Sequence, residues 1–423
     1  MINPYSTLLL ICSLGISLKT TQAQLLSLTL PEAHAQAAEN YPMVRQRDLI
    51  TQSTAYSIDK ANDGYFPQIN INGQATYQSA VTEIPLRVPG MDVPTLNKDQ
   101  YKLYGEVNQH LYDGGAIRLQ KQAIATNADL EQQALEVELY KVKDRVNQLY
   151  FGILLLNEQL LQNDLYQKDI QAGLEKTRAA IANGAALKSS GNLLDAELLK
   201  AEQQVTELRA TRKAYLCMLG LFIDQSLDER TVLEKPVSQP ISAAINRPEL
   251  NWYALQQKGI DVERKLVLAK NRPKLGLFLQ AGAGRPALNM LSNDFETYYY
   301  GGVRLTIPIS GFYTLRKERA LLDIRKTAID VQEETFLFNI DLSVQQQNTE
   351  AAKYRQLLET DNEIIALRTS IKDAALTQLE NGVINTADYV REVNAEDRAK
   401  LAKIYHELQL LKAQYDIQYT TGN

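Results

Sequence analysis

The side chains that most often carry catalysis or bind metals are scarce in this sequence. The chain contains three histidines and two cysteines, all widely separated: His34, His110, His406, Cys12 and Cys217. No phosphate-cradling loop, nucleophile elbow or ligand-spaced histidine and carboxylate group is present, and Gly282-Ala-Gly284 is not followed by a predicted helix. The sequence therefore predicts no enzyme, no cofactor, no metal site and no disulfide framework.

Composition places the chain among ordinary folded proteins. Its 423 residues include 45 basic and 50 acidic side chains, and 45% of the residues are hydrophobic. The formal net charge of −5 is too small for a disordered acidic tail and has the wrong sign for a nucleic-acid binder. The composition therefore disfavours nucleic acid as a partner and indicates no other partner by itself.

An apolar segment near the N-terminus has the length of a signal-peptide core. Residues 8–18 read LLLICSLGISL, and Ala23 is a small residue at a plausible cleavage point, so residues 1–23 are predicted to be a signal peptide. An N-terminal anchor or a buried strand is the alternative, because residues 1–7 lack a positive charge. Cys12 follows Ile11 and not a small residue, which disfavours lipidation. No later run reaches the roughly 20 apolar residues of a membrane-spanning helix, so any contact with a membrane falls to strands or to a surface.

Two parts of the chain repeat one plan. No proline lies between Pro94 and Pro236 or after Pro308, which leaves two very long stretches free to be helical. Anchors recur in the same order and at similar spacing, namely Asn40-Tyr41-Pro42 with Asn246-Arg247-Pro248, and Asn183-Gly184 with Asn381-Gly382. We therefore predict a tandem duplication, with a first repeat at residues 24–235, a second at 236–423, and the seam near Lys235–Pro240.

Four segments of about ten residues alternate between apolar and polar side chains. In residues 66–78, Ile69 and Ile71 share one face while Asn70 and Asn72 share the other; the other segments are 100–112, 273–284 and 298–309. About ten residues is the length of a tilted strand that crosses an outer membrane, and tyrosines bracket the segments as an interfacial girdle would. A soluble, half-buried sheet has the same alternation, but the loops at 83–98 and 284–297, which carry Pro and Gly, favour the membrane interpretation.

The remaining sequence predicts long helices with coiled-coil seams. Leu135, Leu139, Val142 and Val146 begin a series of apolar residues at alternating spacings of four and three. The predicted helices span residues 113–183 and 192–235 in the first repeat, and 311–381 and 387–419 in the second, each repeat also beginning with a shorter helix. Asp113 and Ser310 are predicted N-caps at the points where a strand passes directly into a helix, and Gly114 and Gly311 follow them.

Four membrane strands cannot close a barrel, because the smallest closed barrels have about eight strands. Exposed strand edges are not tolerated in lipid. The subunit is therefore predicted to oligomerise, with two, three or four copies sharing one barrel. Helices that grow from the strand ends would continue the barrel wall as a ring of coiled coils, which makes a tunnel.

Over nearly its whole mature length the sequence resembles the TolC-like outer-membrane efflux proteins. The resemblance rests on Leu28-Thr-Leu-Pro-Glu-Ala-His-Ala-Gln-Ala-Ala-Glu-Asn-Tyr-Pro42, on Leu111-Tyr-Asp-Gly-Gly115 at the entry from strand to helix, and on the duplicated Asn-Gly turns. It implies a mixed α and transmembrane β fold: a homotrimer in which four strands per subunit complete a 12-stranded barrel, continued by a long periplasmic α-helical tunnel.

The resemblance also implies a function and partners. The chain would be the passive outer-membrane channel of a tripartite efflux pump or a type I secretion system in a Gram-negative bacterium. It would work with a periplasmic adaptor and with an inner-membrane transporter of the resistance-nodulation-division or ABC type. A periplasmic coiled-coil adaptor or scaffold is the alternative, but it would not need amphipathic strands that run into helices.

Family members narrow at the periplasmic tip, where acidic residues ring the entrance. Asp388 matches the first acidic position, and Arg391 occupies the second, which argues against a strongly cation-selective double ring. Three converging Asp388 carboxylates would attract cations, although Asp388 could instead only cap the returning helix. The helix turns with small residues are predicted to dock the adaptor: Asn183, Gly184, Gly191, Asn381 and Gly382.

Overall fold

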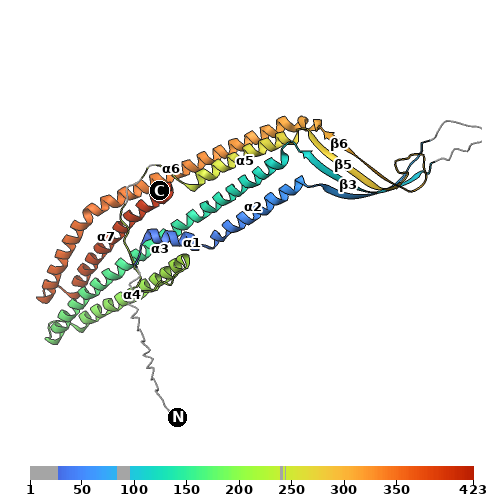
Figure 1. The fold of residues 1–423 in the computed structure, drawn as a ribbon. Helices are drawn as coiled ribbons and strands as arrows, with labels where there is room; N and C mark the ends of the chain where they lie inside the picture. The colour runs from blue at the N-terminus through green and yellow to red at the C-terminus, as the bar shows by residue number, and fades with distance from the viewer. Residues whose placement is uncertain (1–26, 83–95, 239–241, 243) are drawn as a thin grey trace, which may run out of the picture.

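The computed structural model describes residues 27–82, 96–238, 242 and 244–423. Within them the chain forms an elongated, gently curved rod, with helices along most of its length and a sheet at one end (Figure 1). The predicted signal peptide, residues 1–23, lies outside the described residues, as does most of the loop at 83–98.

Seven α-helices and two sheets make up the described part of the chain. The helices are α1 (Leu30–Asn40), α2 (Gln46–Asn62), α3 (Ala116–Ala182), α4 (Lys188–Ile223), α5 (Pro248–Lys270), α6 (Phe312–Glu380) and α7 (Thr386–Thr421). The strands are β1 (Ser27–Leu28), β2 (Gln68–Tyr77), β3 (Asp99–Tyr112), β4 (Val232–Leu233), β5 (Lys274–Arg285) and β6 (Glu296–Thr306). With 67 and 69 residues, α3 and α6 are each about 100 Å long. Among the described helices, none is both long and apolar enough to cross a membrane.

The apolar seam of α3 forms the spine of the helical part. α3 packs against α4, α5 and α7, and its seam residues are buried: Leu135, Leu139, Val142, Val146, Leu149, Ile153 and Leu156. The seam then turns polar, and the amide of Gln167 donates to the amide oxygen of buried Asn163 at 2.7 Å. Apolar burial of this spine supplies the main driving force that holds the long helices together.

The same core continues midway along the rod, where the segments around Leu28 and Leu233 meet α3. There the hydroxyl of buried Tyr150 lies 2.8 Å from the carbonyl oxygen of Leu28 and 2.7 Å from that of Glu234. These contacts hold the small parallel sheet of β1 and β4 against α3. α1 begins beside this sheet, with a capping box between Thr29 and Glu32. Residues 27–32 are therefore held by strand pairing at one end and by the helix cap at the other.

Two predicted elements have wrong boundaries. The helix predicted at 192–235 starts at Lys188 and ends at Ile223, because Asp224 adopts a left-handed conformation with φ of 53° and the chain then folds back to form β4. The strand predicted at 298–309 ends at Thr306, before Pro308, which has no N–H to donate to a ladder. A short 3₁₀ turn, Ile309–Gly311, follows and leads into α6.

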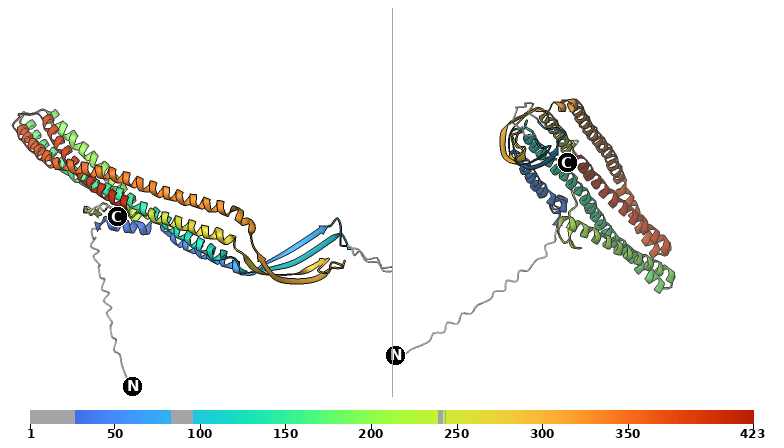
Figure 2. Two further views of the ribbon diagram at one scale, coloured as in Figure 1. Left: turned by 90° about the horizontal axis from the view of Figure 1, so that it is seen from above. Right: turned by 90° about the vertical axis from the view of Figure 1, so that its right-hand side faces the viewer.

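The four long strands form one antiparallel sheet in the order β2-β3-β5-β6. Seen along the rod, the sheet curls into an open arc (Figure 2, right). One long hairpin comes from each predicted repeat, and β3 and β5 join the two hairpins in the middle of the sheet. The outer edges of β2 and β6 therefore have no strand partner within the described chain.

Candidate functional surfaces at the two ends of the rod

The strand register sorts the side chains of the sheet onto an apolar face and a polar face. Ile69 pairs with Val107, which pairs with Leu279, and all three point to one face. Asn70, Glu106 and Gln280 make the next row and point to the other. Because side chains alternate in direction along each strand, the same register places the other apolar positions of the four strands on the first face and most polar ones on the second.

The apolar face of the sheet is exposed. Its large side chains stand far into solvent: Ile69, Ile71, Leu103, Leu277, Leu279, Tyr299, Val303 and Leu305. Ile71 is 80% exposed and Tyr299 is 78% exposed, values that a folded protein in water seldom allows for neighbouring apolar residues. On the central strands, most polar-face residues are more buried than these, which makes the polar face the concave side of the arc. The convex face therefore needs an apolar environment or a partner.

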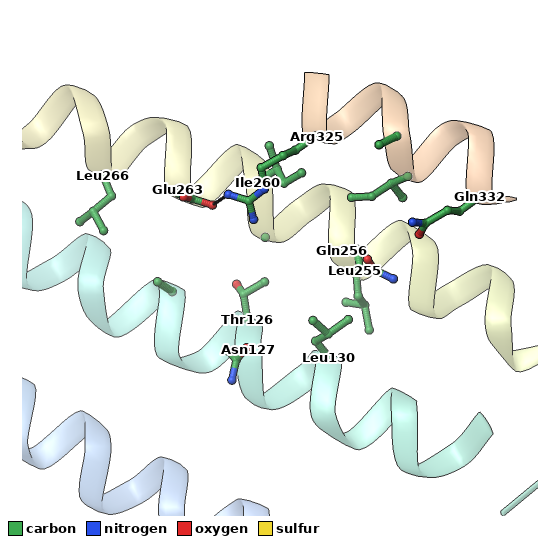
Figure 3. A pocket seen from close by; sticks show the side chains of 14 residues that line it. Thr126, Asn127, Leu130, Leu255, Gln256, Ile260, Glu263, Leu266, Arg325 and Gln332 are labelled. Atoms are coloured by element: carbon green, nitrogen blue, oxygen red, sulfur yellow. Dashed lines mark hydrogen bonds and ion pairs between the residues drawn. The ribbon is translucent and has the colours of Figure 1, made fainter. Parts of the chain in front are cut away.

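An apolar row on α6 is exposed in the same way. Ile324, Val331 and Phe338 follow one another at seven-residue steps, and each is more than half exposed. α6 packs on α5 and α7 with its other faces. Beside this row lies a hollow of about 670 Å³, between α3, α5 and α6 (Figure 3). Its lining is mixed, with an ion pair of 2.8 Å between Arg325 and Glu263 and aliphatic side chains such as Leu130 and Leu266.

The two junctions from strand to helix are built differently. The carboxylate of Asp113 accepts from the N–H of Gly115 at 2.8 Å and of Ile117 at 2.6 Å, so its side chain caps the first turn of α3. Gly115, and not Asp113 as predicted, occupies the N-cap position itself. Gly114 has φ of 74°, a conformation that favours glycine, and a Cβ there would lie 2.9 Å from the Cβ of Arg272.

At the second junction the predicted cap is wrong. Ser310 lies in the 3₁₀ turn, and α6 starts at Phe312, with Gly311 as its N-cap residue and no side-chain cap. Gly311 has an ordinary helical backbone, but the side chain of Asn271 lies where its Cβ would be. Glycine is therefore required at the first junction for its positive φ, and at the second because the side chain of Asn271 approaches the backbone closely.

At the opposite end of the rod, the two Asn-Gly turns share one hydrogen-bond pattern. In the first turn the N–H of Gly184 donates to Ile181 at 3.0 Å and that of Ala185 to Ala180 at 2.8 Å. In the second, Gly382 donates to Leu379 and Val383 to Gln378 in the same geometry. Both glycines have positive φ and open space around them. This is the Schellman arrangement that ends a helix at glycine.

The turn residues differ in exposure. Asn183, Gly184, Asn381 and Gly382 are exposed at the tip. Gly191, predicted to be part of the same docking surface, is buried in α4, where a Cβ would lie 3.2 Å from the Cδ1 of Ile181. Its small size therefore serves the packing of α4 against α3.

Asp388 and Arg391 lie together in the first two turns of α7. Their side chains form an ion pair of 3.1 Å, and Arg391 also contacts Glu392 at 3.1 Å. The N-cap of α7 is Asn385, whose side-chain oxygen accepts from the N–H of Asp388 at 2.9 Å. Asp388 is therefore not the cap, and it shares the guanidinium of Arg391 with Glu392.

Just behind this tip lies a buried charge cluster that the sequence did not predict. Lys372 on α6 contacts Asp169 on α3 at 3.1 Å and Glu396 on α7 at 3.2 Å. Glu396 is only 1% exposed and also accepts from Lys400 at 2.9 Å and Thr369 at 2.7 Å. Tyr389 sits beside the cluster, over Gly173, and donates to the carbonyl of Asp169 at 2.9 Å. The signal in the sequence was Glu396, a charged residue that follows Tyr389 and Val393 at the seam spacings of four and three.

The cluster shifts the pKa values of its members. Burial favours the neutral form of Glu396, but the hydrogen bonds from Thr369, Lys400 and Lys372 outweigh it and lower the pKa of this carboxyl. Burial likewise opposes the charge on Lys372, but Asp169 and Glu396 raise the pKa of its ammonium group. Both groups are therefore charged at neutral pH, and they tie three helices together.

Nothing in the described residues forms a metal site, since no group of three or more His, Cys, Asp or Glu side chains has suitable geometry. No family model matches the sequence, and no curated protein matches it. The relationship of this chain to known proteins therefore rests on its three-dimensional structure.

Solved structures do match over nearly the whole chain. The outer membrane protein VceC from Vibrio cholerae aligns with a TM-score of 0.65 at 12% identity, covering 93% of this chain and 96% of its own. The CmeC outer membrane channel of Campylobacter jejuni aligns at 0.63 with 15% identity, covering 93% and 85%. The MtrE outer membrane channel of Neisseria gonorrhoeae aligns at 0.65 with 14% identity, covering 93% and 89%. The chain thus has the fold of the TolC-like outer-membrane channels, and the predicted resemblance is confirmed at the level of the fold.

Removing the cation of the buried cluster should destabilise the protein. Lys372→Met leaves Asp169 and Glu396 without their shared partner, and we expect a loss of roughly 3 kcal/mol in unfolding free energy, seen as a lower thermal midpoint by circular dichroism. Lys176→Met is the matched control, because its pair with Glu380 is exposed and should matter little. Equal midpoints for both variants would contradict a structural role for the cluster.

The same cluster should be sensitive to acid. Because the pKa of Glu396 is lowered in the folded protein, its carboxylate contributes stability above the ordinary value of 4.5, and this contribution is lost as the pH falls through the lower folded value. Thermal midpoints measured between about pH 6 and about pH 3 should therefore decline less steeply for Glu396→Gln than for the unchanged protein. Glu380→Gln, at an exposed pair, should keep the original profile; a parallel decline for Glu396→Gln would refute the assignment.

Proposed function

We propose that this chain is the subunit of a homotrimeric outer-membrane channel, which serves as the passive conduit of a tripartite efflux pump or type I secretion system. The single observation that carries the proposal is the four-stranded sheet, which exposes an apolar convex face, leaves two full-length edges unpaired, and passes directly into helices about 100 Å long. The fold shared with outer-membrane channels supports it.

In the proposed trimer, β6 of one subunit pairs with β2 of the next. Three subunits then give one barrel of 12 strands with no free edge and with its apolar face toward lipid. The apolar row of Ile324, Val331 and Phe338 on α6 lies against a neighbouring subunit in the helical tunnel. The protein would thus lie in the outer membrane of a Gram-negative bacterium, with the helices extending into the periplasm.

We also propose that the chain arose by tandem duplication, with repeats at residues 24–235 and 236–423. Each repeat supplies one strand pair, one helix longer than 60 residues and one 36-residue returning helix, and both helical turns share one hydrogen-bond pattern. The junctions at Asp113-Gly114 and Ser310-Gly311 have diverged, because only the first keeps its cap.

A periplasmic adaptor or scaffold is the second candidate function, since such proteins also contain long coiled coils. The convex apolar face of the sheet disfavours it. The deciding experiment is the native mass of the protein extracted by detergent from the outer-membrane fraction. Three copies per particle support the channel, and a monomer released by high salt would leave only the scaffold.

Charge on the convex face should block assembly. Ile71→Lys places an ammonium group toward lipid, at an expected cost of about 2–4 kcal/mol if the site is near the mid-plane, and should reduce the trimer recovered from membranes. Asn72→Lys, the next residue on β2, places the same charge on the concave face and should assemble normally. Equal yields of both variants would contradict the assigned faces.

The entrance pair should set ion selectivity. We propose that Asp388 lines the periplasmic entrance and that Arg391 mutes its charge through the 3.1 Å ion pair. Arg391→Ala should therefore raise the preference for cations over anions in single-channel recordings, and Asp388→Ala should lower it. Unchanged conductance and cation block in Asp388→Ala would exclude this residue from the entrance.

The exposed tips should dock the periplasmic adaptor, which links the channel to an inner-membrane transporter of the resistance-nodulation-division or ABC type. Asn183-Gly184 and Asn381-Gly382 offer open space in which adaptor residues can approach the backbone. Asn183→Trp and Asn381→Trp should reduce export while leaving trimer formation intact. Arg145→Trp on α3, away from the tip, is the control, and intact export in the tip variants would contradict docking there.

A further inference from the structure

The concave face of the sheet carries a cluster of aromatic rings, which a water-filled lumen does not require. Tyr298 and Tyr300 on β6 stack with their ring centroids 6.3 Å apart, and Phe278 on β5 meets Tyr300 edge-on at 5.9 Å. All three belong to the same face as Gln280 and Glu106. The polar face predicted from the alternation is therefore aromatic in one region.

Glycines opposite the rings give the cluster its room. Phe278 pairs with Gly302, and Tyr298 pairs with Gly282, across the β5 and β6 ladder. A Cβ on Gly302 would lie 3.2 Å from a ring carbon of Phe278, and one on Gly282 would lie 2.5 Å from the Cβ of Tyr104. The glycines thus leave room beside the rings, which the guanidinium of Arg304 enters next to Phe278.

A basic hollow adjoins the rings on the side nearest the helices. It has a volume of about 330 Å³, and its charged or titratable lining residues are Lys274, Arg304 and His110, with the amides of Gln68 and Asn108 beside them. No Asp or Glu lines it. Lys274 makes no ion pair with any residue that the structure describes, so its charge is available to a ligand.

Arg304 and Phe278 connect the hollow to the ring cluster. The guanidinium of Arg304 lies 4.6 Å from the ring centroid of Phe278, and it reaches Glu106 only at 3.6 Å and Asn108 at 3.4 Å. Side chains two residues apart on one strand face are about 7 Å apart, so Arg304 and Tyr300 are about 13 Å apart along β6. Phe278 lies between them, with its ring centroid 4.6 Å from the guanidinium of Arg304 and 5.9 Å from the ring centroid of Tyr300.

We propose that this surface is a binding site for aromatic carboxylates on the channel wall, one site per subunit. The flat ring of the ligand would pack against Phe278 and Tyr300, and its carboxylate would bind Lys274. Arg304 already pairs with Glu106, so the unpaired charge of Lys274 selects an anion, and the rings select a flat apolar body. The inference deepens the proposed channel function and rests on it, since the site would select among transported solutes.

The test uses the full-length protein in a planar bilayer, with three probes added in turn: 1-naphthoate, acetate, and naphthylmethylammonium. We expect 1-naphthoate to reduce the ionic current in a saturable way, and acetate and the aromatic cation to do so only at far higher concentrations. Phe278→Leu and Lys274→Gln should each raise the concentration of 1-naphthoate for half-block by about five- to tenfold.

The control is Tyr299→Leu, which removes the adjacent ring on the convex face and should leave the block unchanged. Native mass checks that each variant still assembles. Block by acetate as strong as by 1-naphthoate, stronger block by the cation, or unchanged block in both Phe278→Leu and Lys274→Gln would each overturn the site. A protein that conducts no ions would refute the proposed channel instead, and equilibrium dialysis of 1-naphthoate against the detergent-solubilised protein would then still decide the binding site.

Discussion

Unsatisfied backbone groups at the two sheet edges constrain this molecule more than any side-chain contact does. β2 and β6 present full-length ladders of N–H and C=O groups with no strand beside them in the described chain. Such edges invite pairing with another chain in water and are not tolerated in lipid. In the proposed trimer each edge finds the opposite edge of a neighbour, so the fold of one subunit is completed only by its copies. The exposed apolar row on α6 fits the same explanation.

The long helices transmit the geometry of the sheet to the far end of the rod. α3 follows β3 through the Asp113 cap and two glycines with positive φ, and α6 follows β6 through a 3₁₀ turn. These short connections leave little freedom between strand and helix directions. Near the tip, Lys372, Asp169 and Glu396 lie among the apolar residues of a core cluster, and because these ions require specific partners they fix the register of α3, α6 and α7.

Periodicity was the most informative property of the sequence. Alternation in residues 66–78 and at three other segments predicted strands with one apolar face, and the observed register gathers those residues on one face. The seam from Leu135 to Leu156 is buried in α3. Prediction failed where local backbone chemistry decided the outcome. The helix expected to reach residue 235 stopped at Ile223 because Asp224 turns left-handed, and Ser310 gave way to a 3₁₀ turn.

The sequence by itself determined the element types, the two faces of the strands and the Asn-Gly turns, because these follow from side-chain spacing and from the backbone freedom of glycine. Only the tertiary structure decided which distant charges meet. The contacts of Glu396 on α7 with Lys372 and Thr369 on α6, and the meeting of Arg304 with Phe278, depend on how helices and strands from different parts of the chain align. Periodicity gives the direction of a side chain within its own element, whereas the neighbour it meets is set by register between elements, which the local sequence does not encode.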